Sequence, residues 1–501
     1  MAQVIILTGA TYQPDTEPRI QRTLGAYRVA SALMQSGYTV QVIDYIQYMS
    51  AEELVAAVSK HLNKDTLWVG YSSTFFGYFG SFGYQHGKVL TPIEKMYKGN
   101  TNNIGVLYDY IKKNSNAKIV FGGAYVLNLK EDPRVDYYIL GYADVSSVHL
   151  TDYLSGKEKE LLGASTLPIG STLVESSKFE EPKMSNLKTE WGNDSFTLIP
   201  GEPVSLEFAR GCIFKCKFCN YPLLGKKKGT YIRDMEEVRD ELVELWETKK
   251  TDTFYITDDT FNDDNDKMEE FHKLFTSLPF KPKFACFLRI DLMDKFTHQA
   301  DLLLEAGIVG AFFGVESFNH KSARAIGKGL HPDKVKRRLS WVRDKWKGNV
   351  NIGAGLILGL PYDNEQYFQE LYDYVTSEDY PIDHTSFSPL FIQDPRKGTN
   401  SYSSEFTMKP EIYGYTFDDK GNWIHENGLT FDIVSNIALQ FRNIKDQSDK
   451  VGDFQVIPHL ALGIPLSDIL NLTYYELYNK YDIPSLNKQK IDAYKNLIGV
   501  I

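Results

Sequence analysis

The sequence predicts an α/β protein with two β-α-β domains and a helical C-terminal region. Strand and helix patterns alternate over residues 1–155, alternate again over 201–400 in six strand–helix units, and give way to helix patterns alone over 401–501. Alternation of this kind is typical of parallel sheets covered by helices. We therefore predict a doubly wound, Rossmann-like domain, then a partial parallel (β/α)6 barrel, then a mainly helical cap.

The first domain, residues 1–155, is predicted from five short apolar strands separated by helices. The strand patterns lie at 3–9, 39–45, 66–73, 117–125 and 135–143, and the helix patterns at 23–37, 50–62 and 103–114. Residues 156–200 mix Ser, Lys, Glu and Pro with little periodicity, so they are predicted to be a linker. In doubly wound sheets, ligands bind at the carboxyl ends of the strands.

The second domain, residues 201–400, repeats a strand–helix unit six times. Its strands are expected near 203–209, 252–258, 283–290, 310–316, 351–358 and 383–388. In barrels of this kind, chemistry gathers at the carboxyl ends of the strands.

Composition excludes several classes of protein. A formal net charge of −10 and a pI near 5.6 disfavour binding to a long nucleic acid, which needs basic patches. No apolar run approaches the roughly 20 residues that span a membrane, and the N-terminus has the pattern of a strand rather than of a signal peptide. Four cysteines in 501 residues do not make a disulfide framework. We predict a cytoplasmic protein, because clustered thiols in a reducing compartment typically bind metal.

Three of the four cysteines lie within eight positions. Cys212, Cys216 and Cys219 follow the first barrel strand with the spacing C-x3-C-x2-C. A structural zinc site normally has four protein ligands, whereas Cys286 is distant in the sequence and no histidine lies near the loop. Three thiolates leave one position of a metal cluster open. Zinc binding by three cysteines remains the alternative.

In this position the motif resembles that of the radical S-adenosylmethionine (SAM) superfamily. The resemblance implies a 4Fe–4S cluster held by Cys212, Cys216 and Cys219. It also implies that the amino and carboxylate groups of SAM close the open iron, and that one-electron reduction cleaves SAM to a 5′-deoxyadenosyl radical.

Further segments resemble the SAM-binding elements of the family. "FYITDDTFN" ends the second strand where many members carry Gly-Gly-Glu for the SAM ammonium, and a carboxylate suits an ammonium. The alternative for Asp259 is a simple N-cap of the next helix, and Lys328 is expected to be a solvated helix end. Cys286 has the opposite strand parity from Arg289, which favours a buried small residue. The resemblance assigns SAM contacts to Phe218, Asp258, Asp259, Arg289, Glu316, Gly355 and Gly359.

The first domain resembles the cobalamin-binding domains of the same superfamily. The residues expected against the cofactor are Ser72, Ser73, Thr74, Gly122 and Gly123. The loop after the first strand lacks the D-x-H-x-x-G pattern, so it supplies no axial histidine to cobalamin. The Gly- and aromatic-rich insertion at 74–103 is expected to line the substrate site or to fill the cofactor space. A domain that keeps this fold without the cofactor remains the alternative.

The resemblance implies a radical SAM enzyme that uses cobalamin to methylate an unactivated carbon of a small-molecule or natural-product substrate. It also implies an electron donor such as flavodoxin or ferredoxin. Two other functions remain open: a cobalamin-independent cyclisation, rearrangement or oxidation, and a non-catalytic zinc or iron–sulfur protein. The sequence does not identify a catalytic residue.

Overall fold

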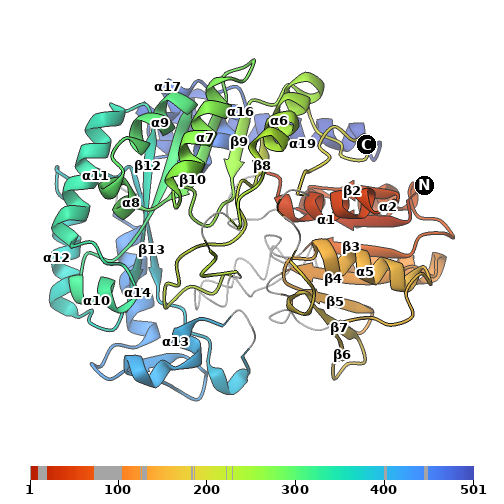
Figure 1. The fold of residues 1–501 in the computed structure, drawn as a ribbon, viewed down its shortest axis with the longest axis horizontal. Coiled ribbons are helices and arrows are strands. Elements are labelled where there is room, and N and C mark those ends of the chain that lie inside the picture. Colours follow the sequence, from red (N-terminus) through yellow and green to blue (C-terminus); the bar gives the residue numbers. More distant parts are fainter. Residues whose placement is uncertain are drawn as a thin grey trace. The chain divides into compact units, whose positions relative to one another are not determined.

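The computed structural model divides into two compact units, each described here by itself (Figure 1). The first comprises Met1–Ser205, Glu236–Thr251 and Ile483–Ile501, and the second comprises Leu206–Met235 and Asp252–Asp482. The described residues are 2–9, 20–72, 104–123, 126, 132–181, 184, 187–221, 223–227, 230–399, 403–444 and 450–501.

The first unit is built on a seven-stranded sheet of order β2-β1-β3-β4-β5-β7-β6. Every strand pairs in parallel with its neighbour except the edge strand β6. The strands are β1 (Val4–Leu7), β2 (Val40–Ile43), β3 (Trp68–Ser72), β4 (Lys118–Gly123), β5 (Tyr137–Leu140), β6 (Ala164–Thr166) and β7 (Thr172–Glu175). The helices are α1 (Leu24–Gln35), α2 (Ala51–Ser59), 104–114, α5 (Asp144–Leu154), α6 (Met235–Lys249) and α19 (Ile483–Leu497). The predicted doubly wound fold is confirmed.

Two segments differ from their expected place. The predicted linker 156–200 contains β6 and β7, which extend the first sheet. In β7 only Leu173 and Val174 are apolar, and both are buried, so the sequence shows no longer apolar run there. The last helix, α19, was expected in the C-terminal cap but belongs to the first unit.

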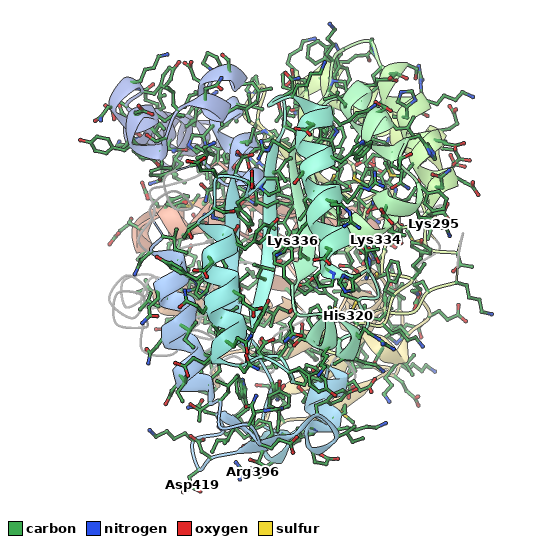
Figure 2. All side chains as sticks on the ribbon, turned by 90° about the vertical axis from the view of Figure 1, so that its left-hand side faces the viewer. Lys295, His320, Lys334, Lys336, Arg396 and Asp419 are labelled. Carbon is green, nitrogen blue, oxygen red and sulfur yellow. The ribbon has the colours of Figure 1, made fainter. Side chains whose placement is uncertain are left out.

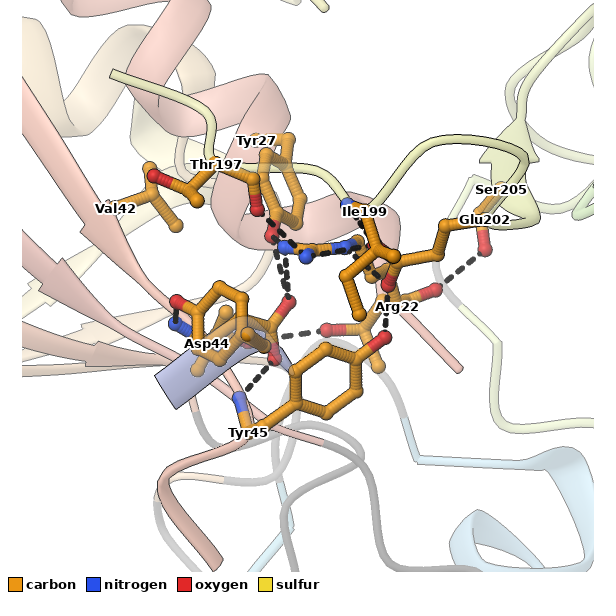
Figure 3. Close-up of polar contacts among 12 residues, drawn as sticks. Arg22, Tyr27, Val42, Asp44, Tyr45, Thr197, Ile199, Glu202 and Ser205 are labelled. Carbon is orange, nitrogen blue, oxygen red and sulfur yellow. Dashed lines mark hydrogen bonds and ion pairs between the residues drawn. The ribbon is translucent and has the colours of Figure 1, made fainter. Parts of the chain in front are cut away.

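A closed network of buried polar side chains lies in the first unit (Figure 3). Arg22 donates to both carboxylate oxygens of Glu202, at 2.6 and 2.9 Å, and lies 3.4 Å from Asp44. Tyr27 donates to Asp44 at 2.6 Å, and the hydroxyl of Tyr494 on α19 accepts from the Asp44 backbone N–H at 2.7 Å. The network therefore ties α19 and the segment around Glu202 to the carboxyl end of β2.

The second unit carries a six-stranded sheet of order β13-β12-β11-β10-β9-β8. All registers from β9 to β13 are parallel. The strands are β8 (Val204–Leu206), β9 (Thr253–Ile256), β10 (Lys283–Leu288), β11 (Ile308–Glu316), β12 (Asn351–Leu358) and β13 (His384–Pro389). The intervening helices are α7 (Asn265–Thr276), α8 (Ile290–Lys295), α9 (Gln299–Ala306), α10 (His320–Ala325), α11 (Pro332–Trp346) and α12 (Glu365–Val375).

Strand parity decides which side chains face the helices. Phe254, Phe271 and Phe284 belong to an aromatic core between the sheet and α7, with Phe271 and Phe284 5.3 Å apart. Cys286 shares the parity of Phe284 and is fully buried, as predicted. Arg289, one residue beyond β10, has the opposite parity and is directed to the site described below.

The C-terminal part of the second unit is mainly helical, with one small hairpin. Its elements are α13 (Glu405–Met408), β14 (Tyr415–Phe417), β15 (Trp423–His425), α14 (Phe431–Arg442), α16 (Val456–Ala461), α17 (Leu466–Asn471) and α18 (Tyr474–Lys480). The antiparallel pair β14–β15 was not predicted. Among the described residues, no helix is long and apolar enough to cross a membrane.

Candidate functional site

The three clustered cysteines lie on the loop that follows β8. Cys212 lies 3.5 Å (Sγ to Oγ1) from Thr260, and the Cys219 backbone N–H donates to the carbonyl of Cys216 at 3.1 Å. Burial raises the pKa of the Cys219 thiol to about 12, and the charges of Asp259, Cys216 and Cys212 add to that rise. The three thiols and the Asp259 carboxyl therefore share one electrostatic environment.

The thiols are not arranged around a single ion. Within the described residues, no group of three or more His, Cys, Asp or Glu side chains converges closely enough to hold a metal ion. Cys286 is fully buried on the helical side of the sheet and gives no fourth thiol. The loop thus offers three sulfur ligands, a donor set that suits an iron–sulfur cluster.

Arg289 connects the cysteine loop to the end of β10. Its Nη1 atom donates to the Cys216 sulfur at 3.6 Å, and its Nε and Nη2 atoms donate to Asp291 at 3.0 and 2.7 Å. The guanidinium also lies 3.8 Å from the centroid of the Phe214 ring. Although burial alone would raise it, the pKa of Asp291 is lowered by these bonds from Arg289. Asp291, Phe214 and Cys216 thus hold the Arg289 guanidinium in place beside the cysteine loop.

Asn262, which the sequence reasoning missed, fixes the backbone of Arg289. Its side-chain oxygen accepts from the Arg289 N–H at 2.9 Å, and its amide donates to the Arg289 carbonyl at 3.0 Å. The side chain is fully buried. The available signal was its place at the end of "FYITDDTFN", beside the two aspartates.

The two adjacent aspartates have different environments. Asp258 is buried, accepts from the backbone N–H groups of Phe208 and Ala209 at 2.8 and 3.1 Å, and pairs with Lys267 at 3.3 Å. It is therefore occupied in joining the end of β8 to the loop after β9. The Oδ2 atom of Asp259 is buried and has no hydrogen-bond partner among the described residues.

Asp259 is the aspartate that remains available to a ligand. Burial raises the pKa of its carboxyl to about 7, and repulsion from Asp258 and Glu207 adds to the rise. The alternative of a helix cap is wrong for this residue, because Asp264 caps α7 by accepting from the N–H groups of Asp266 and Lys267. A buried carboxylate without a donor is costly unless a cation or donor meets it.

Glu316 ends β11 in a left-handed backbone conformation, with φ of 68°. Its carboxylate lies 3.6 Å from Lys328, which also donates to the Gly314 carbonyl at 2.7 Å. The expectation of a solvated Lys328 is wrong, since only 12% of its side chain is exposed. Burial raises the pKa of Glu316, and Lys328 opposes that rise.

The two glycines expected near adenine have partners within the chain. A Cβ on Gly355 would lie 2.8 Å from the Phe312 ring, so this glycine makes room for that ring. Gly359 has φ of +88°, and a Cβ there would lie 2.8 Å from Trp423. The structure thus supplies packing reasons for both residues that the sequence did not indicate. Phe218 is partly buried on the cysteine loop.

The candidate cofactor residues of the first unit lie at adjacent strand ends. Ser72 of β3 pairs with Gly122 of β4, and Gly123 follows it. Among the described residues, no atom lies within 4 Å of a Cβ placed on Gly122. Ser73, Thr74 and the insertion 74–103 lie outside the described residues.

Residues 206–375 match the family model described as the radical SAM superfamily. This segment is therefore a radical SAM domain, as predicted. More particularly, the fold over most of the chain is similar to that of two solved enzymes whose structures contain cobalamin.

Two solved structures carry this likeness. The radical SAM methyltransferase TsrM from Kitasatospora setae, solved with cobalamin and a 4Fe–4S cluster, has a TM-score of 0.63 at 14% identity, covering 98% of this chain and 100% of that chain. The cobalamin-dependent SAM radical enzyme OxsB, solved with aqua-cobalamin and SAM, has a TM-score of 0.54 at 14% identity, covering 92% and 66%.

One curated relative matches by sequence. Cytidylyl-2-hydroxyethylphosphonate methyltransferase from Streptomyces wedmorensis is 26% identical over 157 residues, which is 30% of this chain. The match spans 28% of that relative's length.

Proposed function

We propose that this protein is a radical SAM methyltransferase that uses a 4Fe–4S cluster, SAM and cobalamin to methylate an unactivated carbon of a small-molecule substrate. The observation that carries the proposal is the group at the carboxyl end of the second sheet. There, three thiols, a buried unpaired carboxyl on Asp259 and the guanidinium of Arg289 lie together. The fold likeness to TsrM and OxsB supports the cobalamin part.

Each group of the site has a separate task in this proposal. Cys212, Cys216 and Cys219 hold the cluster, and Arg289 donates a hydrogen bond to one cluster sulfur, which stabilises added negative charge there. The carboxylate of Asp259 binds the SAM ammonium, and this ion pair gives the buried Oδ2 atom of Asp259 a hydrogen-bond donor. When bound, the reduced cluster and SAM supply an adenosyl radical, and cobalamin carries the methyl group.

Glu316 and the first unit complete the proposed binding residues. Glu316, restrained by Lys328, accepts hydrogen bonds from SAM hydroxyl or ammonium groups. Ser72, Gly122 and Gly123, which lie at the ends of the paired strands β3 and β4, approach cobalamin. Ser73 and Thr74 are proposed on sequence alone. A one-electron donor and a reducing cytoplasm belong to the same proposal.

Reconstitution tests this function directly. Protein purified without oxygen is loaded with iron, sulfide and hydroxocobalamin, desalted, and examined by visible spectroscopy and iron analysis. We expect a cluster, retained cobalamin, and formation of 5′-deoxyadenosine or S-adenosylhomocysteine from SAM under reducing conditions. Cys212→Ala should lose the cluster, whereas the matched control Cys286→Ala should keep it.

Three other outcomes count against parts of the proposal. A cluster and SAM cleavage without retained cobalamin would replace methylation by cobalamin-independent radical chemistry. Zinc in place of iron, with no SAM binding, would overturn the enzyme assignment. An unaltered cluster in Cys212→Ala would remove that residue from the ligand set.

A further inference from the structure

The second unit carries a concentrated positive charge in an otherwise acidic chain. Residues 320–349 contain ten Lys and Arg against two Asp, whereas the whole chain has a net charge of −10. Four exposed cations of this stretch, two on α10 and two on α11, form no ion pair with any described residue. They are Lys321, Arg324, Lys334 and Arg337, and we term them the α10–α11 basic surface. Figure 2 shows this region, with His320 and Lys334 labelled.

Among the described residues, the exposed unpaired cations within α11 lie in its first half, and Lys347, which caps its C-terminal end, is a further exposed cation without an ion pair. Further along the helix, Arg338 pairs with Asp294 at 2.9 Å, Arg343 with Asp383 at 2.6 Å, and Lys345 with Asp301 at 2.7 Å. The i,i+3 spacing places each exposed pair, on α10 and on α11, along one helix face.

The starts of the two helices lie close together. The rings of His320, which begins α10, and His331, which caps α11, have centroids 4.6 Å apart. Lys321 and Lys334 therefore belong to one surface rather than to two separate ones.

The same surface backs the cysteine loop. The Lys217 N–H donates to the Ile326 carbonyl, just after α10, at 3.1 Å. Gly327 is exposed, and a Cβ placed on it would lie 3.9 Å from the Cys216 Cα atom. Solvent thus reaches the chain one backbone layer from a predicted cluster ligand. Lys215 and Lys227, on the cysteine loop itself, are exposed as well.

We propose that the α10–α11 basic surface docks a small acidic one-electron carrier protein, whose prosthetic group then faces Gly327. This inference rests on the proposed cluster. In the encounter, the carrier is oxidised by one electron and the oxidised cluster is reduced by one, and no other reactant is needed. Unpaired surface cations steer an acidic partner through long-range attraction. A polar surface of this kind suits the small, transient interfaces of redox partners.

Charge reversal tests the proposal with a purified acidic flavodoxin as the probe. The variant is Lys321→Glu/Arg324→Glu. The matched control is Lys273→Glu/Lys281→Glu, which makes the same change in net charge at exposed positions near the amino end of β10. Both are prepared as reconstituted holoenzyme.

Three readouts are compared at low salt: flavodoxin binding, stopped-flow bleaching of the cluster by reduced flavodoxin, and SAM cleavage driven by dithionite. We expect the α10 variant to bind flavodoxin and accept its electrons at least about tenfold more weakly, while dithionite-driven cleavage is unchanged. The control should match the wild type. Raising the salt to about 1 M, where the Debye length falls to about 3 Å, should abolish the difference.

The other outcomes overturn the inference or separate it from the proposed function. Equal electron transfer in the variant and the wild type, or an equal loss in the control, would exclude this docking surface. If the variant no longer binds duplex DNA but its cluster is still reduced by flavodoxin as in the wild type, the surface binds a polyanion instead. If dithionite drives no SAM cleavage in the wild type, the proposed function fails, whereas flavodoxin binding and cluster bleaching still decide the docking surface.

Discussion

The two units each contain a buried cluster of charged side chains, and the two clusters are built differently. Around Arg22 in the first unit, the carboxylates of Asp44 and Glu202 and the hydroxyls of Tyr27 and Tyr494 have mutual partners (Figure 3). Around Cys216 in the second unit, one carboxyl oxygen of Asp259 has no partner among the described residues, and the sulfurs of Cys212 and Cys216 have polar neighbours at 3.4–3.6 Å.

This difference separates a structural cluster from a binding one. A saturated buried network gives nothing to a ligand, because every donor and acceptor is already matched. An unsaturated one costs stability in the free protein and regains it when a ligand supplies the missing partner. Five substitutions, in four predictions, test this distinction.

The largest effect is expected for Arg22→Met. The change leaves the buried carboxylates of Asp44 and Glu202 without their cation, which should lower the free energy of unfolding in urea by about 3–5 kcal/mol. The control is Lys112→Ala, which removes a partly exposed pair with Asp136 and should cost less than about 1 kcal/mol. If the two variants lost similar amounts of the free energy of unfolding, the result would contradict the structural role of the Arg22 network.

Substitution of the two neighbouring aspartates should have different effects, one on stability and the other on SAM binding. Asp258→Asn removes the charge that pairs with Lys267 and should lower the free energy of unfolding by about 1–3 kcal/mol. Asp259→Asn should leave stability unchanged or raise it, but should weaken SAM binding to the reconstituted protein, measured by calorimetry. The reverse pattern would show that Asp258, and not Asp259, receives the ligand.

Asp363 is an intermediate case, with hydrogen-bond donors but no cation. It accepts from the backbone N–H groups of Gly359 and Leu360 at 3.0 Å and from Ser322 at 2.7 Å. Burial raises the pKa of its carboxyl to about 7.

A folded-state pKa above the unfolded value of about 3.9 favours the protonated form in the folded protein. Asp363 therefore contributes stability below pH about 4 that is lost as the pH rises through about 7. Asp363→Asn should flatten the dependence of the urea midpoint on pH over this window, whereas Asp419→Asn, at an exposed position, should leave it unchanged. A slope unaltered by Asp363→Asn would assign the pH dependence to other groups.

The smallest effect is expected for Tyr494→Phe. It removes one buried hydrogen bond from the Arg22 network, the bond to the Asp44 N–H at 2.7 Å, and should cost about 0.5–1.5 kcal/mol. Tyr475→Phe, at a side chain that is 76% exposed, is the control and should cost nothing measurable in the same titration. If the loss at Tyr494 matched that of Arg22→Met, the hydroxyl would be as important as the charge.

The family and both sheets were predictable because their signals are local. Buried parallel strands produce short apolar runs between helix patterns, and the three cysteines lie within one loop. Strand parity was enough to predict that Cys286 is buried on the side of the sheet opposite to Arg289, since alternate residues of β10 face opposite sides. The strand β7 was missed because only Leu173 and Val174 of its four residues are apolar.

By itself, the sequence predicted the radical SAM domain, most of the strands along the chain, and a loop with three clustered cysteines. Only the tertiary structure decided which aspartate is free, because the N–H groups that occupy Asp258 come from a strand end about 50 residues away. It alone also placed Lys328 beside Glu316 and Tyr494 beside Asp44. The physical reason is common to these cases. The availability of a buried polar group depends on donors and charges that folding brings from distant parts of the chain.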